Sequence, residues 1–259
     1  MPWGADSHEL IGLVPAAGRA TRLGHLPCSK EVLPIGWELG PSHKPRAIVA
    51  CEPLLRQMHR AGVVRALVVV ADGKWDVLAF LGDGQCVGLD LAYLVMADSP
   101  STAHTVARAC PHIGDVTTVF GFPDLVLRPD DALSLIVDRH SVGDADVVLA
   151  LFPTDDSSLF DMVETDGETV REIVIKPPAT NLRLTWLAAV WSVRFTEFVN
   201  AWAAAGSSAD ATPGRELYIG DVVQAAIAEG LAVVGVEVPA GGYDDIGVPG
   251  GIPWRPLTG

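Results

Sequence analysis

Apolar and polar residues follow two rhythms in the first half of the chain. Five short runs rich in Val and Leu have the length of buried strands, at residues 10–15, 66–71, 89–95, 116–120 and 146–152. The segments between them repeat apolar residues at spacings of three and four, which is typical of a helix face, and predict helices over residues 47–61, 75–81, 103–110 and 130–139. Because strands alternate with helices, the pattern predicts an α/β fold with a mostly parallel sheet.

The rhythm changes in the second half. Two short segments, 162–164 and 170–175, flank Asp166-Gly167, a dipeptide that favours a tight hairpin turn. The run from Trp186 to Trp191 predicts a buried or interface strand. The last predicted elements are two helices and the loop of small and polar residues between them, at residues 195–205, 217–229 and 206–214. The sequence contains no repeat of 20–50 residues and no flexible linker, so we predict one domain over residues 1–259.

Composition excludes several classes of protein. The 259 residues include 18 Lys and Arg against 32 Asp and Glu, a formal net charge of −14, and 49% are hydrophobic. This balance supports a large core and argues against binding to nucleic acid or to an anionic membrane surface. No run approaches the roughly 18 apolar residues of a membrane-spanning helix, and the first ten residues lack a secretion signal. A cytoplasmic protein with four reduced cysteines is therefore expected.

One basic loop stands out against this acidic background. Residues 11–36 read IGLVPAAGRATRLGHLPCSKEVLPIG, in which a predicted strand leads into small residues and then Arg19, Arg22 and Lys30. Small residues let backbone amides approach phosphate oxygens, while Arg and Lys neutralise their charge. The spacing matches neither a Walker A motif nor G-x-G-x-x-G. We predict a loop that binds a chain of phosphates, with a surface turn of solvated arginines as the alternative.

Several motifs in order resemble the sugar-1-phosphate nucleotidylyltransferase family. Residues 20–23 (ATRL) and 29–34 (SKEVLP) stand where that family has G-x-G-T-R-L and then P/S-K-x-L-L-P. Further matching segments follow in the family's order at residues 44–45, 81–84, 88–91, 121–124, 175–177, 214–221 and 243–249. The pattern is most similar to the branch of glucose-1-phosphate thymidylyl- and uridylyltransferases.

The resemblance implies a fold and a reaction. The fold is a three-layer α/β sandwich with a Rossmann-like central sheet, in which residues 10–125 bind the nucleotide and residues 126–259 bind the sugar phosphate. The reaction joins a nucleoside triphosphate, with UTP or dTTP favoured, to a sugar 1-phosphate, and releases pyrophosphate. In-line attack at the α-phosphorus requires positioning, positive charge and a divalent cation, here Mg²⁺. Relatives of this kind commonly form homodimers or homotetramers.

The same resemblance assigns roles to residues. Arg22 and Lys30 would act in catalysis by holding the triphosphate and the departing pyrophosphate. The nucleotide-binding set is Ala16, Ala17, Gly18, Arg19, Ala20, Thr21, Met96, Ser101 and Thr102. The sugar-phosphate-binding set is Asp161, Lys176 and Glu216. Asp124 and Asp245 would bind Mg²⁺, with Asp244 as the alternative to Asp245.

Five positions depart from the family pattern. Met96 and Ser101 stand where the family has Gln and Gly near the nucleobase, and Met cannot hydrogen-bond a pyrimidine edge as Gln can. Asp161 replaces a Gly beside the sugar, Ile175 replaces a Glu, and Val248 replaces a Thr. Two alternatives therefore stay open. One is a nucleotidyltransferase that acts on a cyclitol or choline phosphate, and the other is a non-catalytic sugar-nucleotide-binding relative.

Overall fold

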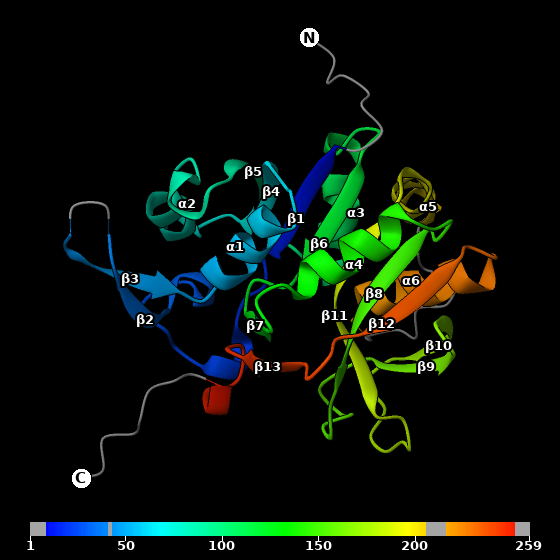
Figure 1. Cartoon of the computed structure of the whole chain (residues 1–259). Helices are drawn as coiled ribbons and strands as arrows, with labels where there is room; N and C mark the ends of the chain where they lie inside the picture. The colour runs from blue at the N-terminus through cyan, green and yellow to red at the C-terminus, as the bar shows by residue number, and fades with distance from the viewer. Residues whose placement is uncertain (1–8, 41–42, 206–215, 252–259) are drawn as a thin grey trace.

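A nine-stranded sheet forms the centre of the part of the chain that the computed structural model describes, residues 9–40, 43–205 and 216–251. Its strand order is β5-β4-β1-β6-β11-β8-β12-β10-β9 (Figure 1). These strands are β1 (Leu10–Ala16), β4 (Arg65–Ala71), β5 (Asp90–Met96), β6 (Thr117–Gly121), β8 (Val147–Pro153), β9 (Met162–Asp166), β10 (Thr169–Val174), β11 (Leu184–Trp191) and β12 (Val233–Glu237).

The sheet is mixed, which corrects the predicted mostly parallel sheet. Strands β5, β4, β1 and β6 run parallel, as expected. Strand β11 lies antiparallel to both β6 and β8, and β10 lies antiparallel to β9 and β12. The reason is the connection between β8 and β11, because residues 154–183 contain the β9–β10 hairpin and no helix. Parallel neighbours need a long crossover, so a chain that returns without a helix enters the sheet antiparallel.

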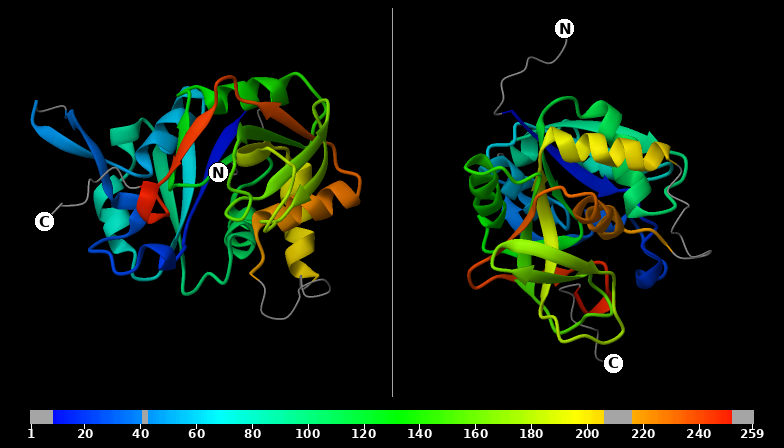
Figure 2. Two further views of the ribbon diagram at one scale, coloured as in Figure 1. Left: turned by 90° about the horizontal axis from the view of Figure 1, so that it is seen from below. Right: turned by 90° about the vertical axis from the view of Figure 1, so that its right-hand side faces the viewer.

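Helices lie on both faces of the sheet (Figure 2). Their bounds are α1 (Glu52–Arg60), α2 (Trp75–Leu81), α3 (Thr102–Ala109), α4 (Ala132–Ser141), α5 (Val193–Ala204) and α6 (Ile219–Ala228). Side chains of α1, α2 and α4, such as Leu54 and Leu133, belong to one hydrophobic cluster. Those of α3, α5 and α6, such as Val106, belong to a second. Side chains alternate between the two faces along β1, so that Val14 belongs to the first cluster and Leu13 to the second. The sheet therefore separates two cores.

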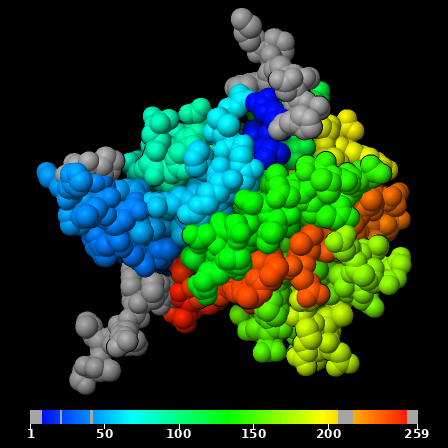
Figure 3. Space-filling view, viewed as in Figure 1, coloured from blue at the N-terminus to red at the C-terminus, as the bar shows by residue number. Residues whose placement is uncertain are grey.

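Two small antiparallel ladders flank the sheet. One pairs β2 (Pro34–Leu39) with β3 (Pro45–Val49) and projects from the body of the molecule (Figure 3). The helix predicted at residues 47–61 is shorter than expected, because β3 occupies the first of these residues. The helix begins only with α1, which has Pro53 in its first turn. The other ladder pairs β7 (Leu125–Arg128) with β13 (Gly242–Asp245), and neither of its strands was predicted. It joins segments that lie far apart in the sequence.

The other predicted helices and strands are confirmed, with bounds that shift by two residues at most. The predicted loop at residues 206–214 lies outside the described residues. Short 3-10 helices occur at Thr21–Leu23, Lys30–Val32, Gln85–Val87, Cys110–His112 and Pro249–Gly251. Within the described ranges, no helix is both long and apolar enough to cross a membrane.

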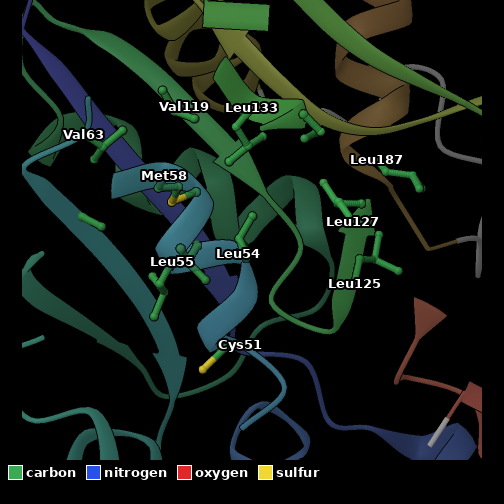
Figure 4. Close-up of a cluster of buried hydrophobic side chains, with 14 of the residues drawn as sticks. Cys51, Leu54, Leu55, Met58, Val63, Val119, Leu125, Leu127, Leu133 and Leu187 are labelled. Atoms are coloured by element: carbon green, nitrogen blue, oxygen red, sulfur yellow. The ribbon is translucent and has the colours of Figure 1, made fainter. Parts of the chain in front are cut away.

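The first core gives a direct test of packing (Figure 4). Ile136 of α4 is fully buried in it, so Ile136→Val is expected to lower the free energy of unfolding by about 1 kcal/mol, through one lost methylene and the space it leaves. Val142, just past the end of α4, is 81% exposed, and Val142→Ala should change stability by less than about 0.5 kcal/mol. Urea titration of both variants measures the difference, and equal losses would contradict the assigned core.

Candidate active site

A cleft of about 570 Å³ opens beside the carboxyl ends of β1 and β6. Most of the sequence-predicted site residues line it, namely Gly18, Arg19, Ala20, Arg22, Lys30, Ser101, Thr102, Asp124, Asp161, Lys176, Glu216 and Asp245. Three predicted residues are not in its lining, because Ala16 and Ala17 are buried at the end of β1 and Met96 ends β5 and packs against the second core. Thr21 begins a 3-10 helix, and its side chain is outside the described part of the structure. The fold thus gathers residues from positions 18 to 245 around one space.

Two carboxylates face one another across a glycine. Ile246 donates its backbone N–H to the carbonyl of Asp124 at 2.8 Å, next to the β7–β13 ladder. Gly247 donates its N–H to Asp245 Oδ1 at 2.7 Å. A Cβ on Gly247 would lie 2.6 Å from Asp124 Oδ2 and 2.8 Å from Asp245 Oδ1, so both carboxylates lie against the same point. Asp244 instead accepts two hydrogen bonds from Arg128, at 2.5 and 3.0 Å, and does not line the cleft.

The carboxylates have opposite pKa shifts. Burial would raise the pKa of Asp124, but the Lys30 ammonium 2.5 Å from Oδ2 holds it below its ordinary value. Burial, followed by the charge of Asp124, raises the pKa of Asp245. Burial opposes the charge of Lys30, yet Asp124 raises the pKa of this lysine. Asp245 therefore has the greater need of an added cation.

This arrangement fits a magnesium ion whose coordination is completed by a bound molecule. Mg²⁺ prefers oxygen ligands and is commonly held by one or two carboxylates together with water and phosphate oxygens. Asp124 and Asp245 supply two carboxylates beside the space that the absent Gly247 side chain leaves open. Within residues 9–40, 43–205 and 216–251, no group of three or more His, Cys, Asp and Glu side chains could hold a metal. The pair would thus need ligands from the bound molecule.

The basic loop contributes two arginines to the cleft. Ala20 adopts a left-handed conformation, with φ of 53°, immediately before the 3-10 helix that carries Arg22. Arg22 is exposed and lies close enough to Asp124 to lower the pKa of that carboxyl. Arg19 pairs with Asp98 at 2.6 Å, and both side chains are exposed. The loop thus presents positive charge to the cleft on a bent backbone.

The hydroxyls of Ser101 and Thr102 have protein partners. Ser101 caps α3, since its Oγ accepts the His104 N–H at 3.4 Å and lies 2.8 Å from His104 Nδ1. Thr102 Oγ1 accepts the backbone N–H of Ile219 at 3.2 Å and so ties α3 to the start of α6. Both residues line the cleft while they hold its walls in place.

Another part of the cleft lining combines charged and aromatic groups. Lys176, with φ of 41°, places its Nζ 3.4 Å from the centroid of the Tyr218 ring. Tyr218 donates its hydroxyl to Glu216 Oε2 at 3.2 Å. Asp161 Oδ2 lies against Gly220 in the first turn of α6, 2.3 Å from where a Cβ would stand, so the N-terminal end of the helix dipole favours its charge. These residues offer one ammonium and two carboxylates to a ligand.

Comparisons with known proteins identify curated relatives of this chain. No model of a known protein family matches the chain. It is 25% identical over 244 residues to the low-salt glycan biosynthesis nucleotidyltransferase Agl11 of Haloferax volcanii. The match covers 92% of this chain and 62% of that protein. The chain therefore spans less than two thirds of the length of this relative.

Solved structures share the fold. A Bacillus anthracis structure assigned as a glucose-1-phosphate thymidylyltransferase, in complex with a sucrose, superimposes with a TM-score of 0.77 at 17% identity, over 93% of this chain and 92% of that one. A UDP-glucose pyrophosphorylase complexed with UDP-glucose gives 0.75 at 15% identity, over 95% and 96%. The resemblance to sugar-1-phosphate nucleotidyltransferases is confirmed.

The structure also adds cleft residues that the sequence did not single out. Tyr218, Gly247 and Trp186 also line the cleft of this chain, and Trp186 is only 3% exposed. Strand β11 is buried, and the Trp186 ring packs at a tilt against the Phe122 ring, with 5.8 Å between the ring centroids. An aromatic residue in a central strand reads as core from sequence, and only the three-dimensional arrangement shows that this one also borders a cleft.

Proposed function

We propose that this chain is an Mg²⁺-dependent nucleotidylyltransferase that makes an NDP-sugar and pyrophosphate from a nucleoside triphosphate and a sugar 1-phosphate. The observation that carries the proposal is one cleft lined by three cations, Arg22, Lys30 and Lys176. The same cleft holds the Asp124–Asp245 pair. Two anionic substrates that must meet in line need such positive charge around them. Residues 10–125 would supply the nucleotide half and residues 126–259 the acceptor half.

Each group would have a defined task in this reaction. Arg22 and Lys30 hold the triphosphate, and Lys176 holds the acceptor phosphate. An oxygen of that phosphate forms a bond to the α-phosphorus while the bond to the β-phosphate oxygen breaks, and pyrophosphate leaves with the electron pair. Asp124 and Asp245 would hold Mg²⁺, which neutralises charge on the phosphates when bound. No protein nucleophile takes part.

The preference for UTP or dTTP is supported by two of the proteins with this fold. One is assigned as a thymidylyltransferase, and the other holds UDP-glucose. The acceptor end of this chain has its own chemistry, because Asp161 and Glu216 add two carboxylates beside Lys176. Hydroxyl or amino groups of a sugar are the hydrogen-bond donors that such carboxylates accept. The proposed homodimer or homotetramer stays a prediction.

The reaction is tested with the purified protein, Mg²⁺, a panel of nucleoside triphosphates and a panel of sugar 1-phosphates that also contains cyclitol and choline phosphates. Pyrophosphate is measured, and the nucleotide product is identified by mass. We expect one pyrophosphate for each sugar nucleotide, and no turnover in EDTA or with Arg22→Met. Triphosphate binding without pyrophosphate release from any acceptor would favour a non-catalytic sugar-nucleotide-binding relative.

The acceptor lysine predicts a dependence on pH. Burial lowers the pKa of Lys176, although the charge of Asp161 opposes this shift. Lys176 therefore loses its proton at a lower pH than an ordinary lysine does. We expect KM for the acceptor to rise with pH in the alkaline range, starting below the pH at which an ordinary lysine loses its charge. In Lys176→Arg the guanidinium stays charged, so this alkaline rise should disappear. KM for the acceptor at each pH is the measurement, and an identical alkaline rise in both proteins would exclude Lys176 as its source.

A further inference from the structure

Two side chains at the start of α2 hold both neighbours of Lys30. Ser29 donates its backbone N–H to Asp76 Oδ2 at 2.6 Å and its hydroxyl to Asp76 Oδ1 at 2.7 Å. On the other side, Glu31 accepts two hydrogen bonds from Lys74 Nζ, at 2.8 and 2.9 Å. Lys30 lies between these anchors and reaches Asp124 in the cleft. The residue that links the basic loop to the carboxylate pair is thus fixed from both sides.

Lys74 also holds the other end of the basic loop. Its third hydrogen bond goes to the backbone carbonyl of Ala16 at 2.7 Å, at the last residue of β1. An ammonium has three N–H groups, so all of them are used. Ala16 and Glu31 stand at the two ends of residues 17–30, and Lys74 therefore joins the ends of the loop through one buried atom.

Burial gives this link its strength and its rigidity. The Lys74 and Glu31 side chains are 13% and 1% exposed, and an ion pair that is shielded from water is screened little by salt. The lysine itself is anchored, because it follows β4, whose last residues pair with β1 and β5. Lys74 therefore fixes the loop to the carboxyl ends of β4 and of β1, the strand that leads into the loop.

We propose that Lys74 and Asp76, here called the α2 clamp, are positioning residues that aim Lys30 at the phosphates of the substrate and hold residues 17–30 in their binding conformation. This proposal rests on the proposed function. The clamp touches no reacting atom and acts through Lys30 and the backbone of the loop. Its contribution is the orientation of positive charge before the triphosphate arrives, for which a misplacement of about 1 Å can cost about a hundredfold in rate.

Two variants test the clamp. Asp76→Asn keeps the size of the side chain and loses one acceptor for Ser29, without leaving a buried charge. Lys74→Met alone would leave Glu31 charged and buried, so it is paired with Glu31→Gln, which removes both charges together. We expect kcat/KM for the triphosphate to fall about tenfold to a hundredfold in either protein. The matched control is Asp166→Asn, which removes an exposed pair with Arg171 on the β9–β10 hairpin and should leave kcat/KM unchanged.

A double-mutant cycle separates positioning from general stability. In a Lys30→Met background the clamp variants should lower kcat/KM by a smaller factor than in the wild type, because only their effect through the loop backbone remains, whereas effects through stability alone would multiply. A clamp variant with wild-type kcat/KM, or one whose loss is undiminished in the Lys30→Met background, would overturn the proposal.

Amide hydrogen exchange gives a readout that does not depend on turnover. Residues 17–30 should exchange faster in both clamp variants than in the wild type or in Asp166→Asn. If the clamp variants exchange faster but the wild type transfers no nucleotide, the proposed function is overturned while the clamp is still supported as the anchor of the loop. Unchanged exchange would overturn the clamp, whatever the activity of the wild type.

Discussion

Asp245→Asn is expected to lower Mg²⁺-dependent turnover about a thousandfold while the melting temperature of the metal-free protein stays the same or rises. The loss follows because one of two carboxylates that would hold the cation is gone, and several kcal/mol of charge stabilisation go with it. The gain in stability follows from the pKa of Asp245, which burial and the charge of Asp124 raise in the folded protein.

The sign of the stability change can be worked out. A carboxyl whose pKa is raised by folding stabilises the fold below its unfolded pKa, and that contribution is lost as pH rises through the folded value. At neutral pH the ionised carboxylate is therefore a cost, which a neutral amide removes. The amide oxygen can still accept the Gly247 N–H that now bonds Oδ1 at 2.7 Å. Turnover and thermal melting should thus move in opposite directions.

The neighbouring residue supplies the control. Asp244 lies one position away on β13 but pairs with Arg128 outside the cleft lining. Asp244→Asn should leave turnover within about twofold, because an exposed pair of this kind contributes little to the fold. Mg²⁺ titrations of turnover and of melting temperature distinguish the two variants. If Asp244→Asn loses the activity and Asp245→Asn keeps it, the two aspartates have been assigned in the wrong order.

The elements of the fold that could be predicted from sequence are those with a local signal. Strands such as β1 and β8 could be predicted because a short run of Val and Leu is by itself the signal of a buried strand. Strands β7 and β13 have four residues each and pair across more than a hundred positions, so no local period marks them. The direction of β11 was missed for a related reason. It depends on what connects it to β8, and not on its own composition.

The candidate site likewise contains residues with a local sequence signal and residues without one. The basic loop was visible because Arg19, Arg22 and Lys30 contrast with an acidic chain. Asp124 and Asp245 could be paired only through the family resemblance, since the ladder that joins them leaves no trace in either segment. The α2 clamp was invisible, because a lysine and an aspartate in the first turn of a helix read as solvated charges. Burial turns such charges into anchors, and burial depends on the whole fold.

The loop and the carboxylate pair share one atom. Asp124 Oδ2 accepts the hydrogen bond from Lys30 Nζ, and the same oxygen is the nearest neighbour of an added Gly247 side chain. A displacement of this oxygen would therefore move a phosphate-binding lysine and a candidate metal ligand together. A single methyl group at position 247 would therefore disturb the lysine and the candidate metal ligand together.

Gly247→Ala is expected to lower kcat/KM about a hundredfold. The new methyl would lie 2.6 Å from Asp124 Oδ2 and 2.8 Å from Asp245 Oδ1, closer than carbon and oxygen atoms approach in proteins, so at least one carboxylate must move. Half-maximal turnover should then require a higher Mg²⁺ concentration. Gly242→Ala on β13 is the matched control, because its methyl would meet no atom within 4 Å and should leave the Mg²⁺ dependence unchanged. Equal Mg²⁺ dependence in Gly247→Ala and the wild type would mean that the carboxylates do not act as a pair around this glycine, and the proposed metal site would have to be abandoned.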